Sequence, residues 1–160
     1  MLVLRSDISR KLKSVSLLLI NIKIFTDNSD DFDYGEIWNN KADIIKSNIE
    51  SAGVRIIGYR SNNKVSVKAA NSLGIKNMML NGDRKKELLS RLDGEYSFKD
   101  ILIMGDELND IELARLSRFS VATATSSLEL KMESDYVSNF SGINAYQEIG
   151  NLILNAKGPY

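Results

Sequence analysis

The chain has 160 residues, 21 of them basic and 21 acidic, so its formal net charge is zero. This length suits one domain with a buried core, and no cluster of Lys or Arg points to nucleic acid or to a membrane surface. There is no Cys and no His, which excludes disulfides and histidine chemistry, and any metal would need oxygen ligands of the kind that Mg²⁺ prefers. No segment predicts a signal peptide or a membrane span, so we expect a cytoplasmic protein.

Residues 1–13 form a leading segment, and residues 14–160 form the single predicted domain. The leading segment mixes apolar and charged residues, which fits either a turn of helix or the remnant of a linker to an upstream domain. We favour a poorly ordered start, because chain ends are rarely fixed without packing.

The first predicted strand lies in the stretch 16–27, a short apolar run rich in Leu and Ile that ends in polar residues. A run of this length and composition is typical of a strand buried on both faces. Ligands bind at the carboxyl ends of strands in an open parallel sheet. Asn21, Lys23, Thr26 and Asp27 therefore lie where any chemistry would occur.

A polar turn at 27–31 comes next, and the aromatic and apolar residues around Gly35 predict a small β-hairpin. The hairpin residues are Phe32, Tyr34, Ile37 and Trp38. An amphipathic helix is then expected over 41–52, with Gly53 as its stop. Its inward face would carry Ile44, Ile45 and Ile49.

Strands and helices alternate through the rest of the chain, which predicts an α/β fold with a doubly wound, mostly parallel, Rossmann-like sheet. Leu88, Leu89 and Leu92 form the expected inner face of one helix. The predicted strands are 54–59, 77–80, 101–104, 119–122 and 134–137, and the predicted helices are 62–73, 84–92, 111–116, a short one opened by 126–129, and 142–155, before a frayed tail.

An acidic cluster, Gly105-Asp106-Glu107-Leu108-Asn109-Asp110, follows the buried strand 101–104. Acidic residues are favourable at the start of a helix in any protein, so Asp106 has a plain structural role available as the cap of a helix near Leu108.

The stretch 16–27 and the stretch 101–110, which contains the acidic cluster, together resemble the haloacid dehalogenase superfamily of phosphatases. The similarity is to its small capless branch, which contains 3-deoxy-D-manno-octulosonate 8-phosphate phosphatase and the acylneuraminate 9-phosphate phosphatases, and which also forms the C-terminal domain of animal CMP-sialic acid synthetases. The family's first motif is Asp-x-Asp-Gly-x-x-Thr-Asp. Here it is Asn21-Ile22-Lys23-Ile24-Phe25-Thr26-Asp27, one residue shorter, and the resemblance covers residues 14–156.

The resemblance implies catalytic roles position by position. Asn21 replaces the nucleophilic Asp, Lys23 replaces the general acid, and Lys86 matches the Lys that pairs with phosphate. Gly58 stands where the family has a Thr or Ser that binds the phosphoryl group. Arg60 follows it and either holds an anion or is an exposed loop charge.

The resemblance also implies a metal site, because the family binds Mg²⁺ through Gly-Asp-Asp-x-x-Asp. The matching residues are Asp106, Glu107 and Asp110. Two outcomes are open at this position: weak Mg²⁺ binding, or none because the ammonium of Lys23 stands in for the ion beside Asp106. Lys23 could alternatively bind an anion.

An amide is a very poor nucleophile and an ammonium cannot do a carboxylate's acid–base work, so we expect impaired catalysis. The first hypothesis is an oligomerisation or regulatory module tied to nucleotide-sugar (CMP-sialic acid type) synthesis, with a synthetase domain as partner. The second is an active Mg²⁺-dependent phosphatase on 3-deoxy-octulosonate or acylneuraminate phosphates, with Asp27 as nucleophile. The third is a binding module for an acidic sugar or nucleotide. The resemblance further implies a homotetramer, with the hairpin at its interface.

Overall fold

The computed structural model describes residues 6–26, 35–61, 63–80 and 82–157. Its centre is a six-stranded sheet in the order β3-β2-β1-β4-β5-β6, and every pairing is parallel. The strands are β1 (Leu17–Asn21), β2 (Arg55–Arg60), β3 (Lys76–Met79), β4 (Ile101–Met104), β5 (Phe119–Ala122) and β6 (Tyr136–Val137). The order reverses between β1 and β4, so the carboxyl ends of these two strands mark the switch point where open α/β sheets bind ligands.

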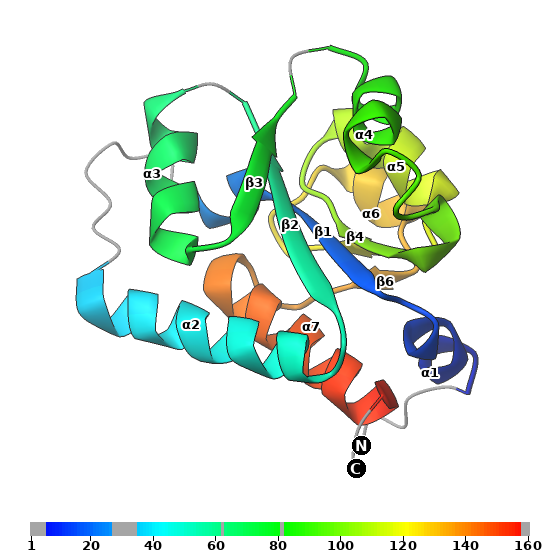
Figure 1. Ribbon diagram of the computed structural model, residues 1–160, viewed down its shortest axis with the longest axis horizontal. Coiled ribbons are helices and arrows are strands. Elements are labelled where there is room, and N and C mark those ends of the chain that lie inside the picture. The colour runs from blue at the N-terminus through cyan, green and yellow to red at the C-terminus, as the bar shows by residue number, and fades with distance from the viewer. Residues whose placement is uncertain (1–5, 27–34, 62, 81, 158–160) are drawn as a thin grey trace.

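Helices cover both faces of this sheet (Figure 1). They are α1 (Ser6–Lys13), α2 (Gly35–Ser51), α3 (Lys64–Leu73), α4 (Arg84–Leu92), α5 (Ile111–Leu116), α6 (Leu128–Glu133) and α7 (Gly142–Lys157). Helices α1, α2, α3 and α7 pack on one face, and α4, α5 and α6 pack on the other. The prediction of a doubly wound α/β fold is confirmed, and the described residues form no cap domain.

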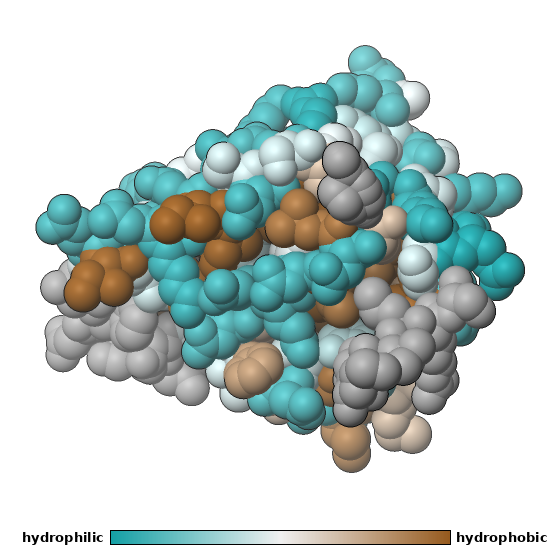
Figure 2. All heavy atoms as spheres, turned by 90° about the horizontal axis from the view of Figure 1, so that it is seen from below, coloured by the Kyte–Doolittle hydropathy of each residue, from teal (hydrophilic) through white to brown (hydrophobic). Residues whose placement is uncertain are grey.

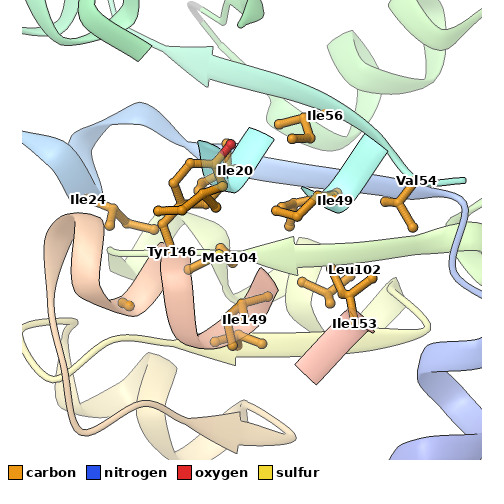
Figure 3. Packing of buried hydrophobic residues seen from close by; sticks show 14 of the residues in the cluster. Ile20, Ile24, Ile49, Val54, Ile56, Leu102, Met104, Tyr146, Ile149 and Ile153 are labelled. Carbon is orange, nitrogen blue, oxygen red and sulfur yellow. The ribbon is translucent and has the colours of Figure 1, made fainter. Parts of the chain in front are cut away.

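Side chains of β1 alternate between two hydrophobic clusters, one on each face of the sheet. Leu18 and Ile20 belong to the cluster under α2 and α7, while Leu17 and Leu19 belong to the cluster under α4 and α5. Figure 3 shows the first cluster, in which Ile20 lies among side chains of α2, β4 and α7. All five residues of β1 are buried, as expected for a strand covered on both sides.

The predicted β-hairpin is wrong for Gly35, Ile37 and Trp38, which form the first turn of α2. The Trp38 ring meets the Phe25 ring edge-on at 6.0 Å, and Phe25 meets Tyr146 in the same way at 5.4 Å. Because of these ring contacts, Trp38 is packed against Phe25 as a residue of a helix, and not as a residue of a hairpin. The other expected hairpin residues, Phe32 and Tyr34, lie outside the described residues.

The expected poorly ordered start is also wrong for Ser6–Lys13, which forms α1. Leu12 of this helix is fully buried, and α1 packs against α7. The Lys157 ammonium donates a hydrogen bond to the Lys13 carbonyl at 2.8 Å, so α7 continues through Ala156 and Lys157, where a frayed tail was expected. The division of the chain at residue 13 stays a prediction.

Two expected core residues face outward instead. Ile44 is 63% exposed because the buried face of α2 consists of Ala42, Ile45 and Ile49, and Leu89 of α4 is 48% exposed. Within the described ranges, no helix combines the length and apolar character that crossing a membrane requires.

Candidate functional site

The site begins where β1 ends, at Asn21. The side chain of Asn21 is buried, and its Oδ1 accepts a hydrogen bond from the backbone N–H of Lys23 at 3.0 Å. This bond caps a single 3₁₀ turn, Ile22–Phe25, that carries Lys23 away from the strand. The turn leaves the Asn21 amide N–H₂ and the Lys23 ammonium both directed at the loop after β4, where the acidic cluster lies.

Asp110 is the centre of the site and is fully buried. Its Oδ1 accepts hydrogen bonds from the Tyr59 hydroxyl and from the Arg84 guanidinium, both at 2.6 Å. Its Oδ2 accepts from the Asn21 amide at 2.8 Å and from the backbone N–H groups of Asp106 and Glu107 at 2.8 and 3.2 Å. An ionised carboxylate offers about four lone-pair positions, so these five donors saturate Asp110.

Glycine at position 105 makes this geometry possible. A Cβ there would lie 2.9 Å from the Cβ of Asp110 and 3.0 Å from Cδ2 of Leu130, closer than packed carbon atoms approach. The chain can therefore turn directly from β4 into the 3₁₀ turn Leu108–Asp110 with Asp110 folded back under it. Asp110, rather than Asp106, is the residue whose carboxylate binds the backbone N–H groups of this turn.

Glu107 lies at the rim and joins two cations. Its Oε2 accepts from the Lys23 ammonium at 2.9 Å, and its Oε1 pairs with the Arg84 guanidinium. Partial burial works against the charge of Glu107, but the bonds from Arg84 and Lys23 outweigh it and lower the pKa of this carboxyl. The bond to Glu107 likewise raises the pKa of Lys23, so Lys23 is a cation at neutral pH.

Asp106 is the third acidic residue, and it is half-buried on the other side of Lys23. Desolvation by burial raises the pKa of the Asp106 carboxyl. The positive charge of Lys23 opposes this rise, and the negative charges of Asp110 and Glu107 add to it. Asp106 is thus a carboxyl with a weakened tendency to ionise, next to an ammonium group.

Arg84 is a central member of the site that the sequence analysis did not select. Its guanidinium bridges Glu107 and Asp110 and lies 5.5 Å from the centre of the Tyr59 ring. Lys86, which was expected to supply this charge, is exposed. The Asp83 side chain caps α4 by accepting the Lys86 N–H, which fixes Arg84 as the first residue of the helix, facing the sheet.

Gly58 and Arg60 do not join this group. Gly58 lies on the opposite face of the sheet from Asn21, where a Cβ would be 2.5 Å from Cδ1 of Ile22. Arg60 donates through Nε to Oδ1 of Asn77 at 2.8 Å, so its charge serves the pairing of β2 with β3. The hydroxyl-bearing residue that does line the site from this part of the chain is Ser61. The sequence feature that could have indicated Ser61 as a site residue was its position just after the second predicted strand.

Two pockets flank Lys23. One of about 400 Å³ is lined by Asn21, Lys23, Ser61, Arg84, Glu107 and the start of α3. The other, of about 630 Å³, lies between Lys23 and Asp106 on one side and the apolar side chains of Phe25, Trp38 and Ile143 on the other. In the first pocket both cations are paired with the Glu107 carboxylate, while the second pocket combines charged groups with an aromatic wall.

The described residues at this site do not fit a divalent cation. Asp110 is saturated by five donors, and both oxygens of Glu107 are paired with cations. Across the described part of the chain, no three His, Cys, Asp or Glu side chains converge in a way that could hold a metal. Among the described acidic residues of the site only Asp106 lacks such partners in the described part of the chain, and a single carboxylate is a weak Mg²⁺ ligand set.

Solved structures with the same fold include phosphatases. The 3-deoxy-D-manno-octulosonate 8-phosphate phosphatase of Moraxella catarrhalis, in complex with magnesium, phosphate and KDO, is 18% identical with a TM-score of 0.76, covering 96% of this chain and 93% of that one. The same enzyme from Yersinia pestis is 22% identical with a TM-score of 0.73, covering 95% and 87%. The chain has the haloacid dehalogenase-like fold.

A further structure, the cobalt-bound deoxy-D-mannose-octulosonate 8-phosphate phosphatase of Haemophilus influenzae, is 16% identical with a TM-score of 0.76 and covers 92% of each chain. No protein-family model matches the sequence, and no curated protein matches it. These haloacid dehalogenase-like relatives therefore share a fold with the chain while differing from it at about four residues in five.

Proposed function

We propose that this chain is a phosphatase-like domain that has lost turnover and acts as an oligomerisation or regulatory module. The observation that carries the proposal is the saturation of Asp110 and Glu107 by the chain's own donors, with Asn21 and Lys23 among them. Both of these side chains occupy the positions that the family uses for its nucleophile and general acid, and both are committed to holding the acidic loop.

The chemistry of the Asn21 and Lys23 side chains supports the proposed loss of turnover. The Asn21 amide carries no charge and its nitrogen lone pair is delocalised into the carbonyl, so it is a very poor nucleophile toward phosphorus; its N–H₂ donates to Asp110 instead. Lys23 keeps its proton at neutral pH because Glu107 raises its pKa, so it is a poor acid and cannot act as a base. Loss of a covalent nucleophile alone typically lowers turnover by about 10⁴-fold or more.

We also propose that the site works without Mg²⁺. Structural neighbours have been solved with magnesium or cobalt bound. Here Lys23 and Arg84 supply two positive charges to Glu107 and Asp110, which removes the electrostatic need for an ion. A cytoplasmic location and a partnership with a nucleotide-sugar synthetase domain belong to the same proposal.

A second function, an active phosphatase on 3-deoxy-octulosonate or acylneuraminate phosphates, is favoured by one observation. Asp106 borders a pocket of about 630 Å³ together with Lys23, and no described residue forms an ion pair with its carboxylate within hydrogen-bonding distance. Asp27, the other nucleophile considered, lies outside the described residues. In this alternative Asp106 would be essential to any turnover.

The two functions are separated by a phosphatase assay with Mg²⁺ on 3-deoxy-octulosonate 8-phosphate and acylneuraminate 9-phosphate. The control is Asp106→Asn, and the Moraxella catarrhalis enzyme serves as the positive reference. We expect the wild-type rate to equal that of Asp106→Asn. Turnover that is present in the wild type and abolished in Asp106→Asn would overturn the proposal in favour of the active phosphatase.

A further inference from the structure

The formal net charge of zero is the sum of regions with opposite charge. Residues 60–92, which include α3, β3 and α4, contain eight Lys or Arg and two Asp or Glu. Residues 93–157, which include β4, β5, β6 and the last three helices, contain five Lys or Arg and eleven Asp or Glu. Because β3 and β6 are the two edge strands of the sheet, the positive excess lies toward one edge of the molecule and the negative excess toward the other.

Exposed lysines gather where α3 and α4 begin. Both helices start at the carboxyl end of the sheet (Figure 1), and their first turns line the same pocket of about 400 Å³. Lys64 and Lys68 of α3 are exposed, as are Lys85 and Lys86 of α4, and we call these four residues the basic rim. Within the described part of the chain, no ion pair involves Lys64, Lys85 or Lys86. These three charges are therefore available to a partner.

A hollow of about 440 Å³ lies on α3, beside the two lysines that this helix gives to the basic rim. The described residues that line it are Asn63, Lys64, Val67, Lys68 and Asn71. Ammonium groups donate hydrogen bonds and accept none, whereas ionised carboxylates only accept them. None of the described lining residues is acidic, so a carboxylate that enters the hollow meets donors and no negative charge.

The spacing of the lysines on α3 fits a particular backbone conformation of the ligand. Residues four apart on a helix have Cβ atoms about 5–6 Å apart, and Lys64 and Lys68 form such a pair. Residues two apart on an extended chain lie about 6.6 Å apart and point to the same side. An extended segment with Asp or Glu at every second position can therefore place one carboxylate at each of these lysines.

The uneven distribution of charge favours a protein segment over other anions. A nucleic acid or an anionic membrane is negatively charged over a long distance, so it would also face the acidic side of the molecule, which repels it. An acidic protein segment has its charge on a few residues and can occupy the basic rim alone. The hollow has no described aromatic ring on which a nucleic-acid base could stack. Figure 2 shows groups of hydrophobic residues on the side of α2 and α7, away from the start of α3 and α4, so the contact at the rim is electrostatic.

We propose that the basic rim binds an extended acidic segment of another protein, which lies along the first turns of α3 and α4 with a carboxylate in the hollow. The positive ends of the two helix dipoles add to the attraction. The proposal goes beyond the proposed function, because it assigns a partner of stated chemistry to a separate surface. It does not depend on the loss of turnover, since none of the four lysines lines either pocket of the candidate site.

Fluorescence anisotropy with a labelled ten-residue peptide of alternating Glu and Ser tests the proposal at low ionic strength. We expect the wild type to bind this peptide and not the matching peptide of alternating Gln and Ser. The double variant Lys64→Gln/Lys85→Gln should raise the dissociation constant at least about tenfold, because it removes one charge-assisted contact on each helix. Both side chains are exposed, so the variant should fold like the wild type, which circular dichroism checks.

The matched control is Lys13→Gln/Lys99→Gln, which removes the same charge from two exposed residues that precede β1 and β4, at the amino end of the sheet. It should leave the affinity for the acidic peptide within about twofold of the wild type. No binding of the acidic peptide by the wild type overturns the proposal, and so does an equal loss in the two double variants. A ten-nucleotide single-stranded DNA or anionic vesicles that bind the rim more tightly than the peptide would overturn it in favour of a nucleic acid or a membrane.

Discussion

Arg84 is the residue that makes a buried charge at Asp110 tolerable. The Asp110 carboxylate has no contact with solvent, and the side chain of Arg84 is 17% exposed. Removing one partner of such a pair leaves an uncompensated charge in a medium of low dielectric constant. We expect Arg84→Met to lower the free energy of unfolding by about 3 kcal/mol, measured by urea denaturation.

Lys86→Met is the natural control for this prediction, since it removes one positive charge two residues further along the same helix. Its side chain is exposed, so its unfolding free energy should stay within about 0.5 kcal/mol of the wild type. Equal losses in the two variants would show that Arg84 does not hold Asp110, and would return Lys86 to the role that the family resemblance suggested.

Some residues of the candidate site could be predicted from the sequence, and others could not. Asn21, Lys23 and the acidic cluster were placed at one edge of the sheet by their positions after buried strands, and Asn21, Lys23, Glu107 and Asp110 are joined there by hydrogen bonds. Arg84 and Tyr59 were missed, because their meeting with Asp110 depends on how α4 and β2 are set against β4. No local pattern encodes that tertiary geometry.

Among the elements, α7 contains a glycine that its helix does not require. A Cβ at Gly150 would lie 3.4 Å from Cγ1 of Ile49 and 3.5 Å from Cγ2 of Ile45, which is ordinary packing distance. We expect Gly150→Ala to stabilise the fold by about 0.5–1 kcal/mol, the usual gain at a helix interior. Urea denaturation of the two proteins side by side measures this gain.

Gly58 provides the contrast, because its added Cβ would lie 2.5 Å from Cδ1 of the buried Ile22 and 3.2 Å from Cδ1 of Ile75. Gly58→Ala should destabilise by about 1 kcal/mol or more through overpacking. A Gly150→Ala variant that loses as much stability as Gly58→Ala would contradict the account of the α2–α7 contact.

Elements with clear periodicity and end signals were predicted well. Helix α3 begins after Asn63, whose side chain accepts the Ser66 N–H, and ends at Gly74 with a φ of 66°. The prediction of a hairpin was wrong because a Gly among aromatic residues is compatible both with a turn and with the start of a helix. The contact between Trp38 and Phe25, which favours the helix, joins two elements that the sequence does not show to be neighbours.

The whole molecule places its acidic loop at the reversal of strand order, where the carboxyl ends of β1 and β4 lie together. That architecture is shared with phosphatases of similar fold whose structures hold magnesium or cobalt. In this chain the same location is filled by an ion-pair network of Lys23, Arg84, Glu107 and Asp110. Within this network two cations are paired with two carboxylates.

The claim that Lys23 and Arg84 take the place of a metal is tested most directly by calorimetric titration of the wild type with Mg²⁺ after treatment with a chelator. Asp106→Asn is titrated in parallel. The account predicts no stoichiometric binding in either protein and no change in the unfolding temperature between Mg²⁺ and chelator. Tight one-to-one binding in the wild type that Asp106→Asn abolishes would contradict it.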